Sequence, residues 1–359
     1  MRLFFGKVPC MKIVVKASEI TQALDRRILL RKPGETSAQP VQAQFTQSLD
    51  RRIILRKPGD TNRQPVQSAK PPPQPEPQAK KELHVMHFAC EVTEWARAQH
   101  RAGKRIGFVP TMGYLHAGHL SLVEEAKKNA DVVCVSIFVN PTQFGPEEDF
   151  EKYPRNEEGD LQLCRDAGVD VVFLPRAESM YASDASVYVF ENKLQNGLCG
   201  ARRPGHFKGV CTVVAKLFNI VLPDIAVFGQ KDYQQVAIIR RMVRDLNFPV
   251  EIITAPTLRE PDGLAMSSRN VYLSPEERQA AVAINQALRS LGQIGAGRPD
   301  AEPLLEQMRM ILNHHGLTED YVAIVDADTL KPVSTVQQGN VALIAAFCGK
   351  TRLIDNRIL

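Results

Sequence analysis

The chain contains no apolar run of the roughly 18 residues that a membrane-spanning helix needs, so the sequence gives no reason to expect membrane binding. Its first 15 residues are apolar and mildly basic, but lysines and Pro9 interrupt the apolar runs. We therefore expect that this segment is not a secretory signal peptide.

Cysteine is also scarce, because the 359 residues hold only seven, an odd number scattered along the chain, and no Cys-x-x-Cys occurs. This usage argues against a disulfide framework and predicts a cytoplasmic protein. The histidines also lack supporting ligands at a suitable spacing, so the sequence offers too few candidate ligands for a closed zinc site.

An excess of positive charge is missing from most of the chain. The net charge of +5 arises in residues 1–80, which hold 15 Lys/Arg against 6 Asp/Glu, whereas the remaining 279 residues hold 30 against 34. The basic character therefore belongs to the N-terminal segment. Nucleic-acid binding by the rest of the chain is not expected.

The N-terminal segment also contains ten of the 24 prolines and a duplication. Residues 24–34 (LDRRILLRKPG) return as residues 49–59 with one change, Ile54 at the position of Leu29. Two short copies are too few for a solenoid of repeats. We expect a mostly disordered arm over residues 1–83, and a bivalent contact of the two copies with an unknown acidic or strand-edge partner stays open.

From about residue 84 the pattern is that of alternating strands and helices. Strand-like runs rich in Val and Ile lie at residues 105–110, 131–139, 169–175, 224–229 and 250–255, with helical patterns between them at 120–129, 157–167, 210–221 and 233–246. This alternation predicts an α/β fold, a Rossmann-like parallel-sheet domain over residues 84–257. Ligands bind at the carboxyl ends of the strands in such sheets.

After residue 257 the pattern changes. Two helical patterns at residues 275–291 and 301–314 precede short strand-like runs near 321–325, 341–346 and 351–354. They predict a smaller C-terminal α+β domain over residues 258–359.

His116 and His119 are the most informative residues, because they stand three apart where a predicted strand passes into a helix. At a helix start, unpaired N–H groups and the positive end of the helix dipole attract phosphate. Gly113 and Gly118 leave room for a ligand to approach the backbone. Half of a metal site, or two unrelated surface histidines, are the alternatives. The position favours a nucleotide polyphosphate.

Two later segments place cations at comparable positions. Lys231, within residues 229–232, follows a predicted strand, and a lysine there can neutralise phosphate charge. An ordinary helix start capped by Asp232 explains the same residues. Residues 266–269 supply two hydroxyls and the permanent cation Arg269, although a turn before the next helix explains them equally well.

Uncharged amides follow another predicted strand. Asn140 and Gln143 can donate and accept hydrogen bonds, which suits a substrate with hydroxyls and a carboxylate. Gln235 lies four residues beyond Lys231, on the same side of a helix. Asp160 is a candidate ligand of Mg²⁺ through water, or simply an acid in a helix's first turn.

These segments together resemble the pantoate–β-alanine ligases. The family motifs Pro-Thr-Met-Gly-x-Leu-His-x-Gly-His, Phe-Val-Asn-Pro-x-Gln-Phe, Lys-Asp-Tyr-Gln-Gln and Asp-Gly-Leu-Ala-Met-Ser-Ser-Arg-Asn are present at residues 110–119, 138–144, 231–235 and 262–270. The resemblance covers residues 84–359, and the arm has no counterpart in it. It implies a homodimeric ligase that condenses pantoate with β-alanine, using ATP and Mg²⁺, through a pantoyl adenylate.

The resemblance also implies roles for individual residues. The implied catalytic residues are His119 as proton donor, His116, Lys231 and Arg269. The implied ATP contacts are Met112, Gly113, Tyr114, Leu115, His116, Ala117, Gly118, His119, Gly229, Gln230, Lys231, Asp232, Leu258, Met266, Ser267, Ser268 and Arg269. Gln143 and Gln235, with Asn140 nearby, are expected to hold pantoate, and Gln143 also to lie near β-alanine.

Two other functions compete with this interpretation. One is a related adenylyl-transferring enzyme that acts on a different acid. The other is a scaffold in which the duplicated arm is the working part.

Overall fold

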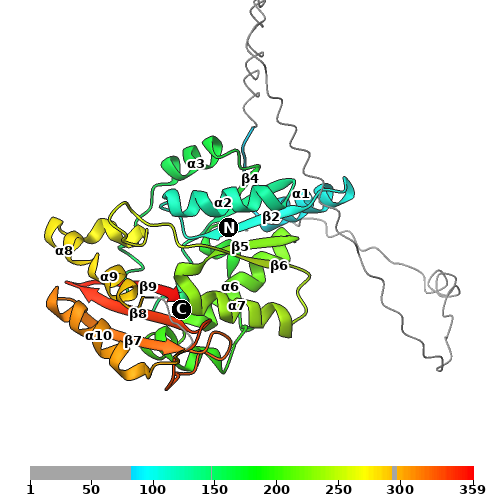
Figure 1. Ribbon diagram of the computed structural model, residues 1–359. Helices are drawn as coiled ribbons and strands as arrows, with labels where there is room; N and C mark the ends of the chain where they lie inside the picture. Colours follow the sequence, from blue (N-terminus) through cyan, green and yellow to red (C-terminus); the bar gives the residue numbers. More distant parts are fainter. Residues whose placement is uncertain (1–81, 147, 293–296) are drawn as a thin grey trace, which may run out of the picture. The chain divides into compact units, whose positions relative to one another are not determined.

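The computed structural model describes residues 82–146, 148–292 and 297–359. The arm predicted for residues 1–83 lies, except for its last two residues, outside this description. Within it the chain forms a parallel sheet with helices on both faces and a smaller antiparallel sheet (Figure 1). This confirms the predicted α/β class with a C-terminal α+β part.

Six parallel strands lie in the order β1-β4-β3-β2-β5-β6. Their bounds are β1 His84–Met86, β2 Ile106–Thr111, β3 Val132–Ile137, β4 Val171–Phe173, β5 Ile225–Gly229 and β6 Glu251–Ala255. From β2 the chain adds β3 and β4 on one side, and then returns to add β5 and β6 on the other. The strand order therefore reverses between β2 and β5, where open parallel sheets bind their ligands.

Both faces of this sheet are covered, which explains its continuous apolar strands. Ile106 and Phe108 of β2 pack with one set of helices, and Val109 packs with the other, because successive side chains of a strand point to opposite faces. The first set is α1 (Ala89–Arg101), α6 (His206–Val221) and α7 (Tyr233–Asp245), and the second is α2 (Ala117–Asn129) and α3 (Glu157–Asp166).

Short helices complete the region around the parallel sheet. They are the α-helices α4 (Ala177–Met180) and α5 (Leu198–Arg202) and the 3₁₀ turns η1 (Pro141–Gln143), η2 (Leu194–Asn196) and η3 (Gln230–Asp232). The turns η1 and η3 follow the ends of β3 and β5, so they lie at the edge where the site is expected.

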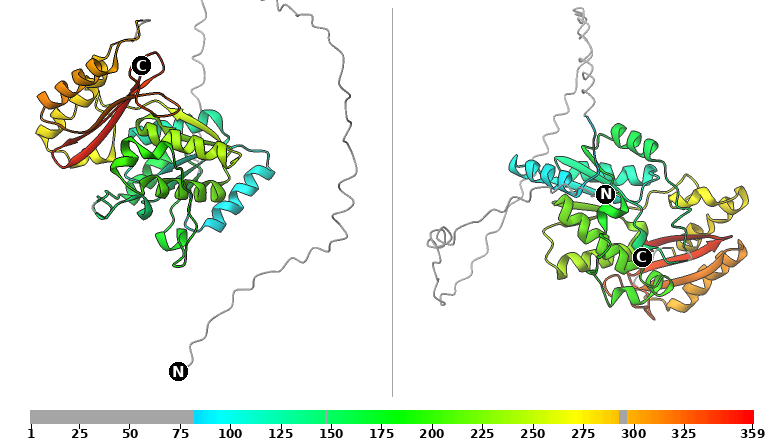
Figure 2. Two further views of the ribbon diagram at one scale, coloured as in Figure 1. Left: turned by 90° about the horizontal axis from the view of Figure 1, so that it is seen from below. Right: turned by 180° about the vertical axis from the view of Figure 1, so that it is seen from behind.

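The C-terminal strands β7 (Thr318–Val325), β8 (Val341–Cys348) and β9 (Thr351–Ile358) form an antiparallel sheet. Their own hydrophobic core includes α9 (Ala283–Ser290) and α10 (Ala301–His314). Figure 2 shows these C-terminal elements gathered at one end of the parallel-sheet region. Val325, Val341 and Leu343 pack into the core of α6 and α7. The two sheets thus share packing, and the domain limits at residues 257 and 258 stay a prediction.

The predicted elements occur with small changes of bounds, and two differences are informative. The helix predicted over residues 275–291 is two helices, α8 (Pro275–Ala280) and α9, with the 3₁₀ turn η4 (Ser268–Tyr272) before them. Strand β1 and helix α1 were not predicted from the sequence. The helical spacing of Val92, Trp95 and Ala96 could have revealed α1. No helix in the described ranges is long and apolar enough to cross a membrane.

Candidate active site

A cavity of about 220 Å³ opens at the carboxyl edge of the parallel sheet, beside the reversal between β2 and β5. Fifteen of the predicted site residues line it. They are Met112, His116, Gly118, His119, Asn140, Gln143, Gly229, Lys231, Asp232, Gln235, Leu258, Met266, Ser267, Ser268 and Arg269. The fold therefore brings together segments that lie more than a hundred residues apart in the sequence.

The two histidines are held by their own helix start. His116 is the N-cap of α2, and its Nδ1 accepts the backbone N–H of Gly118 at 3.1 Å. The Nδ1 of His119 accepts the backbone N–H of His116 at 3.3 Å. Since both Nδ1 atoms are acceptors, each neutral ring carries its proton on Nε2. The pair thus offers two N–H donors to a ligand.

The absence of a side chain at Gly118 leaves room for the ring of His116 over the helix start. A Cβ at this position would stand 2.8 Å from the His116 ring and 3.5 Å from the Cβ of Met266. A side chain here would displace the histidine that caps the helix. The packing of the His116 ring therefore favours glycine at this position of the His-x-Gly-His pattern.

Burial keeps both rings uncharged. It lowers the pKa of His116 to about 4, with a further lowering by the charge of Lys231. It lowers the pKa of His119 to about 3, helped by His116 and Lys231. Near neutral pH both rings are hydrogen-bond donors without a positive charge. The positive charge that faces a bound anion must therefore come from other residues.

Lys231 supplies one such charge. It lies in η3 directly after β5, and its half-buried Nζ is 3.4 Å from a carboxylate oxygen of Asp232. Asp232 stands at the N-cap position of α7, where the cap was expected, but its side chain forms no capping hydrogen bond. The Asp232 carboxylate contacts the ammonium group of Lys231 instead.

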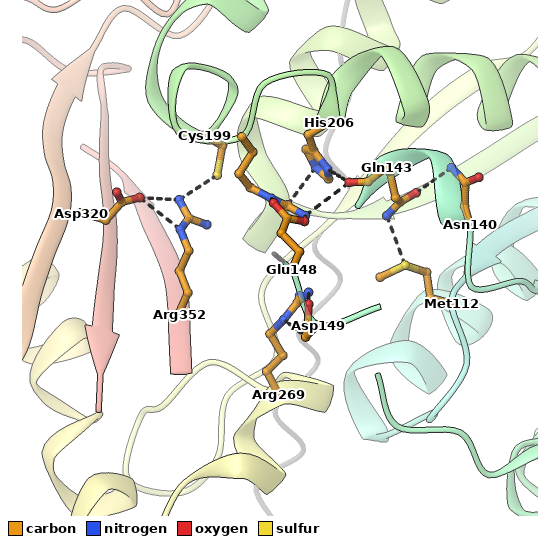
Figure 3. Close-up of polar contacts among 11 residues, drawn as sticks. Met112, Asn140, Gln143, Glu148, Asp149, Cys199, His206, Arg269, Asp320 and Arg352 are labelled. Carbon is orange, nitrogen blue, oxygen red and sulfur yellow. Dashed lines mark hydrogen bonds and ion pairs between the residues drawn. The ribbon is translucent and has the colours of Figure 1, made fainter. Parts of the chain in front are cut away.

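Arg269 is paired rather than free. Its Nε and Nη2 donate to the two carboxylate oxygens of Asp149 at 2.9 and 2.8 Å (Figure 3). Burial alone would lower the pKa of Arg269, but the hydrogen bonds and charge of Asp149 raise it. The sequence analysis missed Asp149, which lies just beyond the motif around Gln143. A phosphate group would have to share or replace this carboxylate.

The two serines before Arg269 order the same loop. The Ser267 side chain accepts the backbone N–H of Arg269 at 3.3 Å, and the Ser268 hydroxyl donates to the carbonyl of Tyr114 at 3.2 Å. The second contact ties this loop to the segment after β2. Each hydroxyl is thus partly used by the protein itself.

The side-chain amides of Asn140 and Gln143 differ in how strongly the protein already binds them. Asn140 is 1% exposed; its oxygen accepts from the hydroxyls of Thr142 and Tyr181, and its Nδ2 donates to Gln143 Oε1 at 3.2 Å. These contacts favour a positioning role for Asn140. Gln143 donates from Nε2 to the sulfur of Met112 at 3.1 Å (Figure 3), a weak contact that a substrate oxygen can replace.

Arg203, in the loop before α6, and His206, the first residue of α6, hold the backbone of Gln143. His206 Nδ1 lies 2.8 Å from the Gln143 carbonyl oxygen, so it donates (Figure 3). The Nη1 of Arg203 lies 3.1 Å from Nε2 of the same ring. Arg203 also forms a bidentate ion pair with Glu148. Arg203 and His206 thus position Gln143.

Gly209 brings α6 close to the same turn. A Cβ at Gly209 would overlap the backbone carbonyl of Thr142 in η1, so only glycine allows this approach. The helix can therefore line the cavity with Val210, Val213 and Val214. The result is an apolar wall next to the amide of Gln143.

The two neighbouring glutamines at the start of α7 point to different places. Gln235 lines the cavity, and its amide has no hydrogen-bond partner among the described residues. Gln234 is buried and donates to the carbonyls of Leu194 and Gly197, away from the cavity. Only Gln235 is placed to meet a substrate.

Asp160 and five predicted ATP contacts lie outside the cavity lining. The carboxylate oxygens of Asp160 accept the backbone N–H groups of Tyr114 and Leu115 at 2.8 and 2.6 Å. The five contacts are Gly113, Tyr114, Leu115, Ala117 and Gln230. Asp160 therefore fixes the loop after β2, and its predicted contact with magnesium stays untested.

The fold and the site define an α/β protein with a cavity for an anionic, nucleotide-like ligand at the strand-order reversal. The family model described as Pantoate-beta-alanine ligase matches residues 84–358. The chain belongs to the pantoate–β-alanine ligase family and is therefore a ligase.

Curated relatives agree with this assignment. The chain is 55% identical over 279 residues to the pantothenate synthetase of Thermotoga petrophila, a match that covers 77% of this chain and 100% of the relative. It is 57% identical over 278 residues to the pantothenate synthetase of Fervidobacterium nodosum, covering 76% and 99%.

Solved structures show the same fold. The pantothenate synthetase of Thermus thermophilus has a TM-score of 0.71 and 46% identity, over 77% of this chain and 99% of that one. The ligase of Francisella tularensis has a TM-score of 0.65 and 35% identity, over 77% and 98%, and was solved with a form of ATP and β-alanine. The additional residues of this chain lie N-terminal to the family match.

Proposed function

We propose that the protein condenses pantoate with β-alanine at the expense of ATP, in two steps. A carboxylate oxygen of pantoate attacks the α-phosphorus of ATP, the bond to the β-phosphate breaks, and pyrophosphate leaves. The amine of β-alanine then attacks the acyl carbon of pantoyl adenylate. The C–O bond to AMP breaks, the amine loses a proton, and pantothenate is released with AMP.

The observation that carries this proposal is that one cavity holds two chemically different sets of groups. The first set is the N–H donors of His116 and His119 with the cation Lys231. The second set is the amides of Gln143 and Gln235 with the apolar wall of α6. A reaction that joins an acid to a nucleotide needs both sets in one place, since most of its acceleration comes from positioning and charge stabilisation.

The donors of the first set suit a phosphate that gains charge. Neutral imidazole N–H groups bind a phosphate oxygen without repelling Lys231, and they need no reorganisation during the step. Lys231 then carries the charge compensation for the departing pyrophosphate. Arg269 joins it when a phosphate oxygen takes the place of Asp149.

The second set of groups favours pantoate over a smaller or more polar acid. Pantoate carries two hydroxyls, a carboxylate and a geminal pair of methyl groups. The amides of Gln143 and Gln235 suit the oxygens, and Val210, Val213 and Val214 suit the methyl groups.

Magnesium is proposed only as the counter-ion of ATP. Among the described residues, no group of three or more His, Cys, Asp or Glu side chains is arranged to hold a metal ion, and both oxygens of Asp160 already accept N–H groups. The residues present do not fit a dedicated magnesium site. No step of the proposed reaction is assigned to the metal.

Exchange of labelled pyrophosphate into ATP tests the first step alone. We expect exchange with pantoate in the absence of β-alanine, and pantothenate formation when β-alanine is added. Exchange with another acid but not with pantoate would show the related adenylyl-transferring enzyme instead. An absence of exchange with every acid would leave the scaffold hypothesis.

A homodimer and a cytoplasmic location remain part of the proposal. Both come from the sequence analysis, the first through the family resemblance and the second through cysteine usage. Sedimentation analysis of the purified chain checks the first, and fractionation of cells checks the second.

A further inference from the structure

Asn356 on β9 is a buried residue of the antiparallel sheet whose side chain reaches the parallel-sheet site. It is 2% exposed. Its Nδ2 donates to the backbone carbonyls of Gln230 and Lys231 at 2.8 and 2.9 Å, and its Oδ1 accepts from the side chain of Gln230 at 3.2 Å. All three side-chain contacts therefore go to η3, the turn that carries Lys231.

An asparagine amide is well matched to this position. Its two N–H groups satisfy two successive carbonyls at once, and its oxygen accepts the only side-chain donor that η3 directs toward it. The turn itself has no side-chain cap. Asn356 therefore fixes the backbone from which the half-buried Lys231 projects into the cavity.

The preceding residue of β9 holds the other cationic loop. Asp355 is 3% exposed and forms a bidentate pair with Arg259 at 2.6 and 3.0 Å. Arg259 forms an isolated antiparallel bridge with Ala265, immediately before Met266. Two successive residues of one strand thus hold η3 and the hairpin that leads into residues 266–269.

We propose that Asn356 is a positioning residue for the adenylation step, acting through Lys231. The C-terminal sheet is then part of the catalytic apparatus, because β9 sets where the lysine stands relative to the loop of Arg269. This inference rests on the proposed function. Since a displacement of about 1 Å can cost roughly a hundredfold in rate, we expect Asn356→Ala to lower kcat for exchange at least about tenfold. The KM for pantoate should change less than about twofold.

A double-mutant cycle separates this role from general damage. Asn356→Ala, Lys231→Ala and the double variant are compared in single-turnover formation of pantoyl adenylate. If Asn356 acts through Lys231, its removal costs at least about tenfold in the wild-type chain and less than about threefold when Lys231 is already absent. Equal costs in both backgrounds overturn the proposal.

Asn340→Ala is the matched control. Asn340 is also a buried asparagine of the antiparallel sheet region, 3% exposed, and its Oδ1 accepts the backbone N–H of Gln337 at 2.8 Å. We expect it to lose stability in urea unfolding but to keep its exchange rate. A rate loss equal to that of Asn356→Ala would overturn the specific role.

Two further comparisons keep the result decisive. Asn356→Asp keeps the size but replaces the donor by an acceptor facing two carbonyls, so we expect it to be as slow as the alanine variant; wild-type rates in it contradict the proposal. If Asn356→Ala does not fold, Asn356→Ser, which keeps one donor, enters the same cycle. Pantoate-dependent exchange by the wild-type chain tests the proposed function separately, so its failure is distinguishable from that of the positioning role.

Discussion

His116 and His119 owe their chemistry to the hydrogen bonds of their Nδ1 atoms. Each Nδ1 accepts a backbone N–H group, which fixes the tautomer and directs an Nε2 donor outward. The lowered pKa values of about 4 and about 3, caused first by burial, keep the donors neutral. A charged pair would repel Lys231 and bind a phosphate less selectively.

Removal of the more buried donor should slow the reaction strongly. We expect His119→Ala to lower kcat for adenylate formation by about a hundredfold or more, because it deletes a transition-state donor and the acceptor of the His116 N–H. Initial-rate measurements check this. His100→Ala, at a half-exposed ring paired with Asp224, is the control and should keep its activity. Near-native turnover of His119→Ala would contradict the assigned role.

Asp149 competes with phosphate for Arg269. Asp149→Asn removes the negative charge but keeps the size, so Arg269 becomes available to a polyphosphate. We expect the KM for ATP to fall by about fivefold, as for loss of one partly buried competing charge. Glu148→Gln is the matched control, since the neighbouring carboxylate pairs with Arg203 instead. A higher KM for ATP in Asp149→Asn would show that the carboxylate assists binding.

His206 makes stability depend on pH. Burial, followed by the charge of Arg203, lowers its pKa to about 4, whereas Glu148 and Asp232 oppose the shift. The unfolded chain then binds more protons than the folded one between about pH 4 and 6.5, so stability falls as the pH falls through this window.

The expected size of this effect is roughly 2 kcal/mol between about pH 8 and pH 5. His206→Gln keeps a donor for the Gln143 carbonyl. We expect the difference in unfolding free energy between the two pH values to be smaller by about this amount in the variant. Urea unfolding at both pH values measures it. An unchanged pH dependence would show that folding does not lower the pKa of His206.

Among the elements, the parallel sheet and most of its helices could be predicted because their signals are local. Val- and Ile-rich strands and the 3.6-residue apolar period of α6 and α10 require only neighbouring residues. The strand β1 has three residues, too few for a period. No proline or glycine lies at the break between α8 and α9, so no local residue signals it.

The site could be predicted as far as its motifs reach. The cavity brings together His119, Lys231 and Gln143, as the motifs imply, although their roles await mutagenesis. Contacts between distant segments could not be predicted from spacing. The pairing of Asp149 with Arg269 spans 120 residues, and the contact of Asn356 with Lys231 spans 125. Such contacts depend on how β9 and the loop after β3 are placed by the whole fold.

The strand β9 also supports stability through Asp355. Asp355→Asn leaves Arg259 without its charge partner, so we expect a loss of about 2–4 kcal/mol in the free energy of unfolding, toward the lower end because Arg259 is partly exposed. Urea unfolding checks the loss. Glu319→Gln, at a more exposed carboxylate paired with Arg309, is the control and should change stability by less than about 1 kcal/mol. Equal losses in the two variants would show that the Asp355–Arg259 pair contributes no more to stability than an exposed pair.

At the scale of the whole molecule, the basic N-terminal segment ends close to where the family match begins. The basic excess lies in residues 1–80, and the family match begins at residue 84. Every residue that lines the cavity lies between Pro110 and Arg269. The match to the Thermotoga petrophila relative covers all of that protein but only 77% of this chain. The arm is therefore an addition to a ligase of family length.

Deletion of residues 1–81 should leave catalysis intact, because none of the cavity residues is removed and the family relatives match the remaining part. We expect kcat and the KM values for ATP and pantoate to stay within about twofold of the full chain, as for a change away from the reacting groups. Pyrophosphate exchange on both forms measures this. A loss of more than about tenfold would place the arm in the catalytic cycle. If activity is kept, a second experiment tests for a bivalent partner of the arm. The isolated arm with both copies of the repeat is compared with an arm that has one copy. A partner that binds both copies should be retained far more strongly by the two-copy arm.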